Sequence, residues 1–250
     1  MQRAAQAGDG FVELYSRATV YNFIVLYMWK TMSDPTFLRR RFVILISGHG
    51  SNMKAIARAC QSGACSADVA AVISNRADSA GLAWAREQGI PTEVVSHKDY
   101  SSREAFDAKL AEVISQHSPD YVLLAGFMRV LTPGFVEKFS TKLINIHPSL
   151  LPAFPGLHTH AQALATGVQV HGCTVHFVTP ILDHGPIIAQ GIVPVRAGDT
   201  PESLAERLLG IEHTVYAQVS IWLSEGRVHL LPDHRVAVDA VESRMFYLEQ

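Results

Sequence analysis

The sequence has few cysteines, no excess of charge of either sign and no long apolar run, and each lack excludes a class of protein. Its 250 residues contain three cysteines, Cys60, Cys65 and Cys173, which give neither an even disulfide framework nor a C-x-x-C ligand pair. We therefore expect a reducing compartment, the cytoplasm. With 21 basic and 23 acidic residues the net charge is −2, so nucleic acid and anionic membranes are not expected as partners.

The apolar stretch from Tyr21 to Trp29 is the one segment that resembles a membrane anchor. It is far shorter than the roughly 20 residues that a membrane helix needs, and no small-residue cleavage site follows it. We therefore expect no membrane association. We expect residues 1–40 to be an N-terminal extension, either disordered or a non-native start, with Met32 as the alternative initiator.

From Arg41 onward, short β-branched and aliphatic runs alternate with helical patterns. Each strand-like run is continuously apolar, as in parallel strands that are covered on both faces. This alternation predicts an α/β fold with a Rossmann-like, doubly wound and mostly parallel sheet. The expected strands are 42–46, 69–73, 93–95, 121–125 and 143–146, and the expected helices begin near 53, 80, 102 and 132.

The second half of the chain has a different pattern. Two strand-like runs, 171–178 and 187–195, flank a proline-bounded loop, and a long helix over 201–224 precedes a closing strand at 227–230. We expect this half to add a mixed sheet within one domain of residues 41–235. Residues 236–250 are expected to form a C-terminal tail. In sheets of this kind, ligands bind at the carboxyl ends of the strands.

A glycine loop follows the first expected strand. Gly48 and Gly50 permit a tight turn, and Ser51 and Asn52 begin the next helix, whose N-terminus offers unpaired N–H donors to an anion. The loop is not a dinucleotide fingerprint, because Met53 occupies the third glycine position, and no Gly-Lys-Ser/Thr makes it a P-loop. An ordinary strand-to-helix turn and a monophosphate site both fit this segment. Its place after the first strand of the sheet favours the phosphate.

Six histidines lie between residues 145 and 184 and suggest a zinc site. Zinc requires three or four convergent ligands at defined spacing. One close pair exists, and no H-E-x-x-H or cysteine pair supports it, so we expect no metal. The six are His147, His158, His160, His171, His176 and His184.

Asn145, His147 and Asp183 suggest a different chemistry. Asn145 and His147 lie two residues apart at a strand end, so both side chains point the same way. Amide and imidazolium can donate to a developing oxyanion, and a carboxylate can hold the imidazole charged and relay protons. Taken alone, His147 would be interpreted as a satisfied loop histidine and Asp183 as a turn carboxylate; the catalytic interpretation depends on the three residues together. The sequence lacks G-x-S-x-G, which favours direct acyl transfer without an acyl-enzyme.

Five ordered blocks of sequence resemble one known family, phosphoribosylglycinamide formyltransferase. They are SGHGSN at 47–52, AGFMRVLTP at 125–133, NIHPSLLPAFPGLHTH at 145–160, HGCTVHFV at 171–178 and LDHGP at 182–186. Together they span about residues 41–230. The resemblance implies the formyltransferase fold and transfer of the formyl group of 10-formyltetrahydrofolate to the amine of glycinamide ribonucleotide, a step of purine biosynthesis. It also implies small-molecule partners, no metal, and a monomer or homodimer.

The resemblance further implies roles for the matching positions. Asn145 would touch the formyl group, His147 would be the proton donor, and Asp183 would be the carboxylate that keeps it charged. The ribonucleotide would be held by Gly50, Ser51, Asn52 and Glu212. The folate site would be lined by Arg103 and by the backbone of Met128, Arg129, Val130 and Leu131.

Two positions depart from the family pattern. Three other functions are alternatives to the formyl transfer that the resemblance implies. His49 lies inside the glycine loop, and His184 adds a titrating group beside Asp183. Formyltetrahydrofolate hydrolase sends water to the formyl group, but it carries a sizeable N-terminal domain and reads His-His where this chain has His147-Pro148. Methionyl-tRNA formyltransferase needs a further RNA-binding domain. A non-catalytic folate- or nucleotide-binding module is the remaining alternative.

Overall fold

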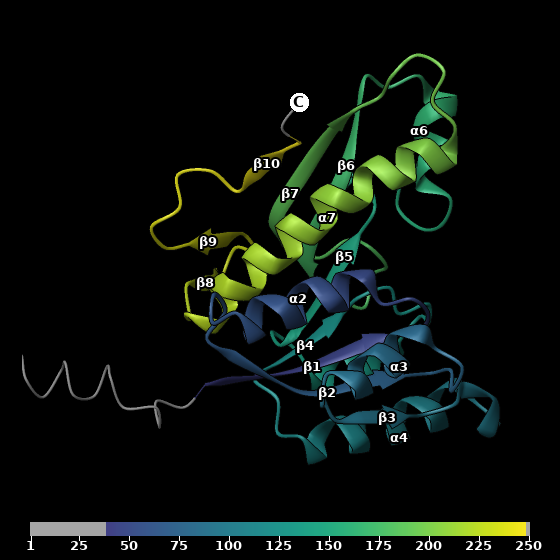
Figure 1. Cartoon of the computed structure of the whole chain (residues 1–250), viewed down its shortest axis with the longest axis vertical. Helices are drawn as coiled ribbons and strands as arrows, with labels where there is room; N and C mark the ends of the chain where they lie inside the picture. The colour runs from purple at the N-terminus through teal and green to yellow at the C-terminus, as the bar shows by residue number, and fades with distance from the viewer. Residues whose placement is uncertain (1–38, 249–250) are drawn as a thin grey trace, which may run out of the picture. The chain divides into compact units, whose positions relative to one another are not determined.

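The computed structural model describes residues 39–248, so the expectations for residues 1–38, including an initiator at Met32, lie outside the described part. From Arg40 onward the chain forms one compact unit. Eight strands of this unit form one sheet in the order β10-β7-β6-β5-β4-β1-β2-β3 (Figure 1). Their bounds are β1 (Arg40–Ile46), β2 (Ala67–Ser74), β3 (Thr92–Val94), β4 (Tyr121–Leu124), β5 (Leu143–His147), β6 (Val170–Phe177), β7 (Ile187–Pro194) and β10 (Met245–Tyr247).

The sheet is mostly parallel, which confirms the predicted fold class. Strands β3, β2, β1, β4 and β5 run parallel, and β6 lies antiparallel between β5 and β7. The strand order reverses on either side of β1, because β2 and β4 flank it. At such a switch point the connections leave in opposite directions, so a crevice opens outside the carboxyl ends of the strands. The glycine loop after β1 and the end of β5 both lie at this edge.

Helices cover both faces of the sheet, which explains why β1 is apolar at successive positions. Phe42, Ile44 and Ile46 belong to the core under α2 and α7, whereas Val43 and Leu45 belong to the core under α4 and α5. In Figure 1, α2 and α7 lie together over one face and α4 lies over the other. The helices are α2 (Ser51–Gln61), α3 (Ala80–Glu87), the 3-10 turn η1 (His97–Asp99), α4 (Arg103–Gln116), α5 (Pro133–Lys138), α6 (Thr159–Thr166) and α7 (Pro201–Ser224).

The longest helix, α7, is tied to the middle of the sheet by a buried tyrosine. The Tyr216 hydroxyl lies 3.1 Å from the carbonyl oxygen of Leu124 and 3.2 Å from that of Ile144. These carbonyls belong to β4 and β5. At its start, α7 is capped by Thr200, whose hydroxyl accepts from the Ser203 N–H in a capping box. The helix is therefore fixed at its first turn and again where it crosses the site-bearing strands.

The end of the chain differs from the sequence expectation. The expected closing strand, β8 (Val228–Leu230), pairs with β9 (Val236–Val238) in a separate two-stranded sheet. Strand β10 then pairs with β7 at the edge of the main sheet, so the described residues beyond 235 add two strands. No helix among residues 39–248 is long and apolar enough to cross a membrane.

Candidate active site

Asn145 and His147 lie near the carboxyl end of β5, and the neighbouring strand β6 fixes the amide of Asn145. The strand register places His176 opposite Asn145, and Asn145 Nδ2 lies 3.3 Å from His176 Nε2. His176 Nδ1 donates to the carbonyl of Phe177 over 2.8 Å, so in the neutral ring Nε2 carries a lone pair. Burial lowers the pKa of His176, which favours that neutral ring. Asn145 therefore turns its NH2 group, not its oxygen, toward His176.

His147 faces an oxygen acceptor at each ring nitrogen. Its Nδ1 lies 3.5 Å from Asp183 Oδ2, and its Nε2 lies 3.1 Å from the carbonyl oxygen of Phe154. The side chains of His147 and Asp183 are each only 8% exposed. Because a carbonyl and a carboxylate both accept hydrogen bonds, the arrangement suits a doubly protonated ring. The structure thus brings together the histidine and the carboxylate that the sequence places 36 residues apart.

The loop between β6 and β7 holds Asp183 through backbone geometry. Asp183 adopts a φ of 50°, and its Oδ2 also accepts the N–H of Gly156 over 2.9 Å. Two residues later, a Cβ added to Gly185 would lie 1.7 Å from the carbonyl oxygen of Phe177. Only glycine allows the loop to pass this close to β6. The position of the carboxylate therefore depends on a glycine contact that is separate from the histidine.

The glycine loop and α7 form a second polar group. Gly50 adopts a φ of 66° as the residue before α2, and Asn52 Nδ2 donates to Glu212 Oε2 over 2.8 Å. Burial raises the pKa of Glu212, while this bond opposes the shift. The residue before α3 also holds the glycine loop, because the Ser79 hydroxyl donates to the carbonyl of Gly48 over 2.7 Å. Asn52 and Glu212, 160 residues apart, are thus in direct contact, with the free N-terminus of α2 beside them.

Exposed apolar side chains border the loops around Asp183 and the segment after β4. They are far more exposed than large apolar residues usually are: Leu182 is 57%, Leu157 65% and Met128 66% exposed. Ile181 and Val130 belong to the same set. Arg103, the first residue of α4, is exposed as well. Such a surface suits a flat, largely apolar ligand with a few polar groups.

The two positions that depart from the family pattern, His49 and His184, are both exposed. Within residues 39–248, no group of three or more histidine, cysteine or carboxylate side chains is arranged to hold a metal ion. His160 and His171 instead contact each other, with 3.2 Å between Nδ1 and Nε2. The described histidines therefore give no geometric support for a zinc site.

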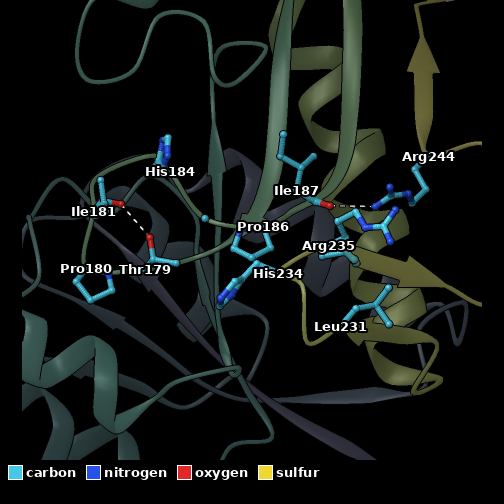
Figure 2. Close-up of a pocket in the computed structure, with 12 residues that line it drawn as sticks. Thr179, Pro180, Ile181, His184, Pro186, Ile187, Leu231, His234, Arg235 and Arg244 are labelled. Carbon is cyan, nitrogen blue, oxygen red and sulfur yellow. Dashed lines mark hydrogen bonds between the residues drawn. The ribbon is translucent and has the colours of Figure 1, made fainter.

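A cavity of about 1010 Å³ lies beside the loop that carries Asp183. Figure 2 shows it between that loop, from Thr179 to Ile187, and side chains near the C-terminus that include His234 and Arg244. Arg244 Nη1 donates to the carbonyl of Ile187 over 2.9 Å, so the C-terminal segment is bonded to the start of β7. Asp183 does not line this cavity, which distinguishes it from the site at His147.

His176 is a site residue that sequence reasoning missed. In the sequence it is only one of six histidines between residues 145 and 184, whereas in the structure it lies opposite Asn145 on the neighbouring antiparallel strand. The antiparallel register of β5 and β6 would have identified it. The site thus has two polar groups: Asn145, His147 and Asp183 form one, and Asn52 and Glu212 form the other. Among the described residues, no direct hydrogen bond joins the two groups.

Comparison with known proteins gives consistent results. The model of the family described as formyl transferase matches residues 40–220. The chain is 49% identical over 188 residues to phosphoribosylglycinamide formyltransferase of Escherichia coli, covering 75% of this chain and 89% of that protein. It is 46% identical over 198 residues to the trifunctional purine biosynthetic protein adenosine-3 of Bos taurus, covering 79% of this chain and 20% of that one. The crystal structure of glycinamide ribonucleotide transformylase 1 from Symbiobacterium toebii superposes with a TM-score of 0.78 at 46% identity, covering 80% and 94% of the two chains.

Proposed function

The chain belongs to the formyl transferase family, and from this premise we propose that it is a phosphoribosylglycinamide formyltransferase. It transfers the formyl group of 10-formyltetrahydrofolate to the amine of 5-phosphoribosylglycinamide in purine biosynthesis. The two matched relatives and the solved structure support this reaction by their names and by their coverage of the chain. The observation that carries the proposal is the contact between His147 and Asp183 beside Asn145.

The reaction needs groups that stabilise an oxyanion and move one proton. The uncharged amine attacks the formyl carbon, a C–N bond forms, and the formyl oxygen becomes negative. The second N–H of the Asn145 amide and the Nε2–H of His147 donate to this oxygen, with the substrate oxygen replacing the carbonyl of Phe154. Asp183 stabilises the charged imidazole through Nδ1. As the bond to N10 breaks, a proton from the amine passes through His147 and Asp183 to N10, which leaves as tetrahydrofolate.

The ribonucleotide phosphate binds at the N-terminus of α2. Gly50, Ser51 and Asn52 present backbone N–H groups there, and the helix dipole favours an anion. The Glu212 carboxylate accepts a hydrogen bond from the Asn52 amide, and in this proposal it also contacts the polar part of the same substrate. Both residues hold each other in place before the substrate arrives.

The folate binds over the exposed apolar surface. Arg103 at the start of α4 offers a charge for the carboxylates of the glutamyl tail. The ring site is lined by the backbone of Met128, Arg129, Val130 and Leu131, and Asn145 lies at the formyl group. Holding both substrates in line supplies on the order of 7–11 kcal/mol of barrier reduction in well-oriented systems. No metal takes part in this mechanism.

Replacing His147 with Ala tests the assignment. We expect His147→Ala to abolish formyl transfer while tetrahydrofolate binding, measured by titration, stays close to that of the unaltered protein. His229→Ala, which changes an exposed histidine in the β8–β9 hairpin, serves as the matched control. Normal turnover by His147→Ala would show that the histidine is not the proton donor.

Formyltetrahydrofolate hydrolase is the competing function. Asn145, His147 and Asp183 would activate water equally well. The feature that favours transfer to an amine is Pro148, directly after His147. Formate release from 10-formyltetrahydrofolate, measured with and without 5-phosphoribosylglycinamide, separates the two. Release that does not depend on the amine would replace our proposal with the hydrolase. Binding of both substrates without any turnover would indicate the non-catalytic module.

We further propose that the protein works in the cytoplasm on small-molecule substrates, as a monomer or a homodimer. Size-exclusion chromatography with light scattering distinguishes the two assembly states.

A further inference from the structure

The segment that joins β4 to α5 is held at two points by buried side chains. The backbone N–H of Met128 donates to the Ser47 hydroxyl over 2.8 Å, and the N–H of Thr132 donates to Asp107 Oδ2 over 2.6 Å. Ser47 is 6% exposed and Asp107 is 3% exposed. Ser47 follows β1 and Asp107 belongs to α4, so the two anchors come from different elements. The segment is therefore clamped at both ends.

Between the two anchors the backbone is left free. The peptide groups of Arg129, Val130 and Leu131 make no hydrogen bond with any residue that the structure describes. The segment also faces solvent, since Val130 is 51% and Met128 66% exposed. Backbone groups that are neither paired nor buried are available to a ligand. Three consecutive residues with free peptide groups at the carboxyl end of β4 are suited to bind a ring that has its own donors and acceptors.

The serine anchor is itself fixed. The Ser47 hydroxyl donates to Asn75 Oδ1 over 2.7 Å, so its lone pairs are directed to the Met128 N–H. Asn75 is 4% exposed and contacts His97, with 3.2 Å between Asn75 Nδ2 and His97 Nδ1. A hydroxyl between a buried acceptor and a backbone donor cannot rotate without losing a bond. The position of Met128 thus depends on a chain of three polar side chains.

The aspartate anchor carries a sign of functional selection. Its second oxygen, Asp107 Oδ1, is buried and has no hydrogen-bond partner among the described residues. A half-satisfied buried carboxylate is unfavourable for stability alone. Asp107 also lies one helical turn after Arg103, so α4 carries both the expected folate-binding arginine and this anchor.

We propose that Ser47 and Asp107 are positioning residues for the co-substrate, which hold the backbone of residues 128–131 in the conformation that binds the folate ring. This inference rests on the proposed function, because it assigns these residues to the folate side of the same site. Neither side chain touches the reacting atoms. Both act through the peptide groups between them.

The first measurement needs no substrate. Hydrogen exchange of the peptide spanning residues 126–132 in the unaltered protein, Ser47→Ala and Asp107→Ala reports whether the anchors order the segment. We expect exchange to speed up in this peptide in both variants and to stay unchanged in β5. Asp107→Asn keeps an acceptor oxygen and should restore most of the protection, which makes it the conservative variant if Asp107→Ala folds poorly.

The second measurement separates positioning from general stability. We expect both alanine variants to raise the KM for 10-formyltetrahydrofolate and the Kd for tetrahydrofolate about tenfold, the effect of losing one backbone anchor. The KM for 5-phosphoribosylglycinamide should change less than about twofold. Asp120→Ala is the matched control, because Asp120 also accepts a backbone N–H, from Arg41, at a place remote from the site. It should leave both KM values unchanged.

Three results would overturn the proposal. They are unchanged exchange in residues 126–132, an unchanged folate KM in both alanine variants, or an equal rise in the KM of both substrates. A failure of the proposed function can be told apart from a failure of this inference. In that case the unaltered protein would show no amine-dependent formyl transfer, whatever the hydrogen-exchange rate of residues 126–132.

Discussion

Gly185→Ala is expected to slow formyl transfer about 100-fold, although Gly185 supplies no catalytic group. A Cβ at this position would lie 1.7 Å from the carbonyl oxygen of Phe177 and 3.3 Å from Nδ1 of His176. Strand β6 cannot yield, because its residues pair with β5 on one side and β7 on the other. The loop must therefore move by about 1 Å, and a displacement of that size at a catalytic group costs about 100-fold in rate. Asp183, two residues before the glycine, moves with it.

Steady-state kinetics and thermal unfolding together test this reasoning. We expect kcat to fall about 100-fold and the melting temperature to fall by several degrees, since overpacking costs roughly 1–3 kcal/mol. The matched control is Gly210→Ala in α7, where an added Cβ meets nothing within 4 Å. Alanine should stabilise that helix by about 1 kcal/mol and leave kcat unchanged. If Gly185→Ala retains kcat within about twofold, the close passage of the loop does not set the position of Asp183.

Three further changes test other parts of the structure. Burial, and secondarily the charge of His160, lowers the pKa of His171 to about 4, so the unfolded chain binds its proton first as pH falls below 6.5. The free energy of unfolding should therefore drop by about 3 kcal/mol between pH 6.5 and 4, and His171→Gln should flatten that slope in urea titrations. Tyr216→Phe removes the hydroxyl that bonds α7 to the carbonyls of β4 and β5 and should lower the free energy of unfolding by about 1 kcal/mol, with kcat as the check that the site survives. Asn52→Ala removes the donor that holds Glu212 and should raise the KM for 5-phosphoribosylglycinamide about tenfold with the folate KM unchanged.

The parallel half of the fold is predictable because its signal is local. Each buried strand is apolar at successive residues, as Phe42 to Ile46 show, and the long helix is predicted with the bounds Pro201–Ser224 that it has. These patterns depend on residues near one another in sequence. The fold class was therefore confirmed from β1 to α7.

The C-terminal strands were not predictable in the same way. Strand β10 has three residues, Met245 to Tyr247, and it exists because the edge of β7 is available to pair with it. The expected closing strand, β8, pairs with β9 in a separate sheet and not with the main sheet. Pairing of short strands is decided by tertiary contacts, which no window of sequence contains.

The site shows the same division between local and long-range information. Asn145 and His147 could be inferred as a pair because strand alternation places them on one side. His176 could not be inferred in this way, because it is 31 residues from Asn145 in the sequence. Their contact requires the antiparallel register of β5 and β6. The anchors Ser47 and Asp107 were likewise not foreseen, since each bonds a backbone group more than 20 residues away.

The buried Tyr216 gives α7 a further consequence. Glu212 and Tyr216 lie one turn apart on this helix, the first in contact with Asn52 and the second bonded to β4 and β5. A single helical turn rises about 5.4 Å. The same stretch of α7 therefore ties the residue proposed for the ribonucleotide, Glu212, to β4 and β5, the strands that precede the proposed folate segment and carry Asn145. A change in this turn of α7 would therefore act on both proposed substrate sites at once.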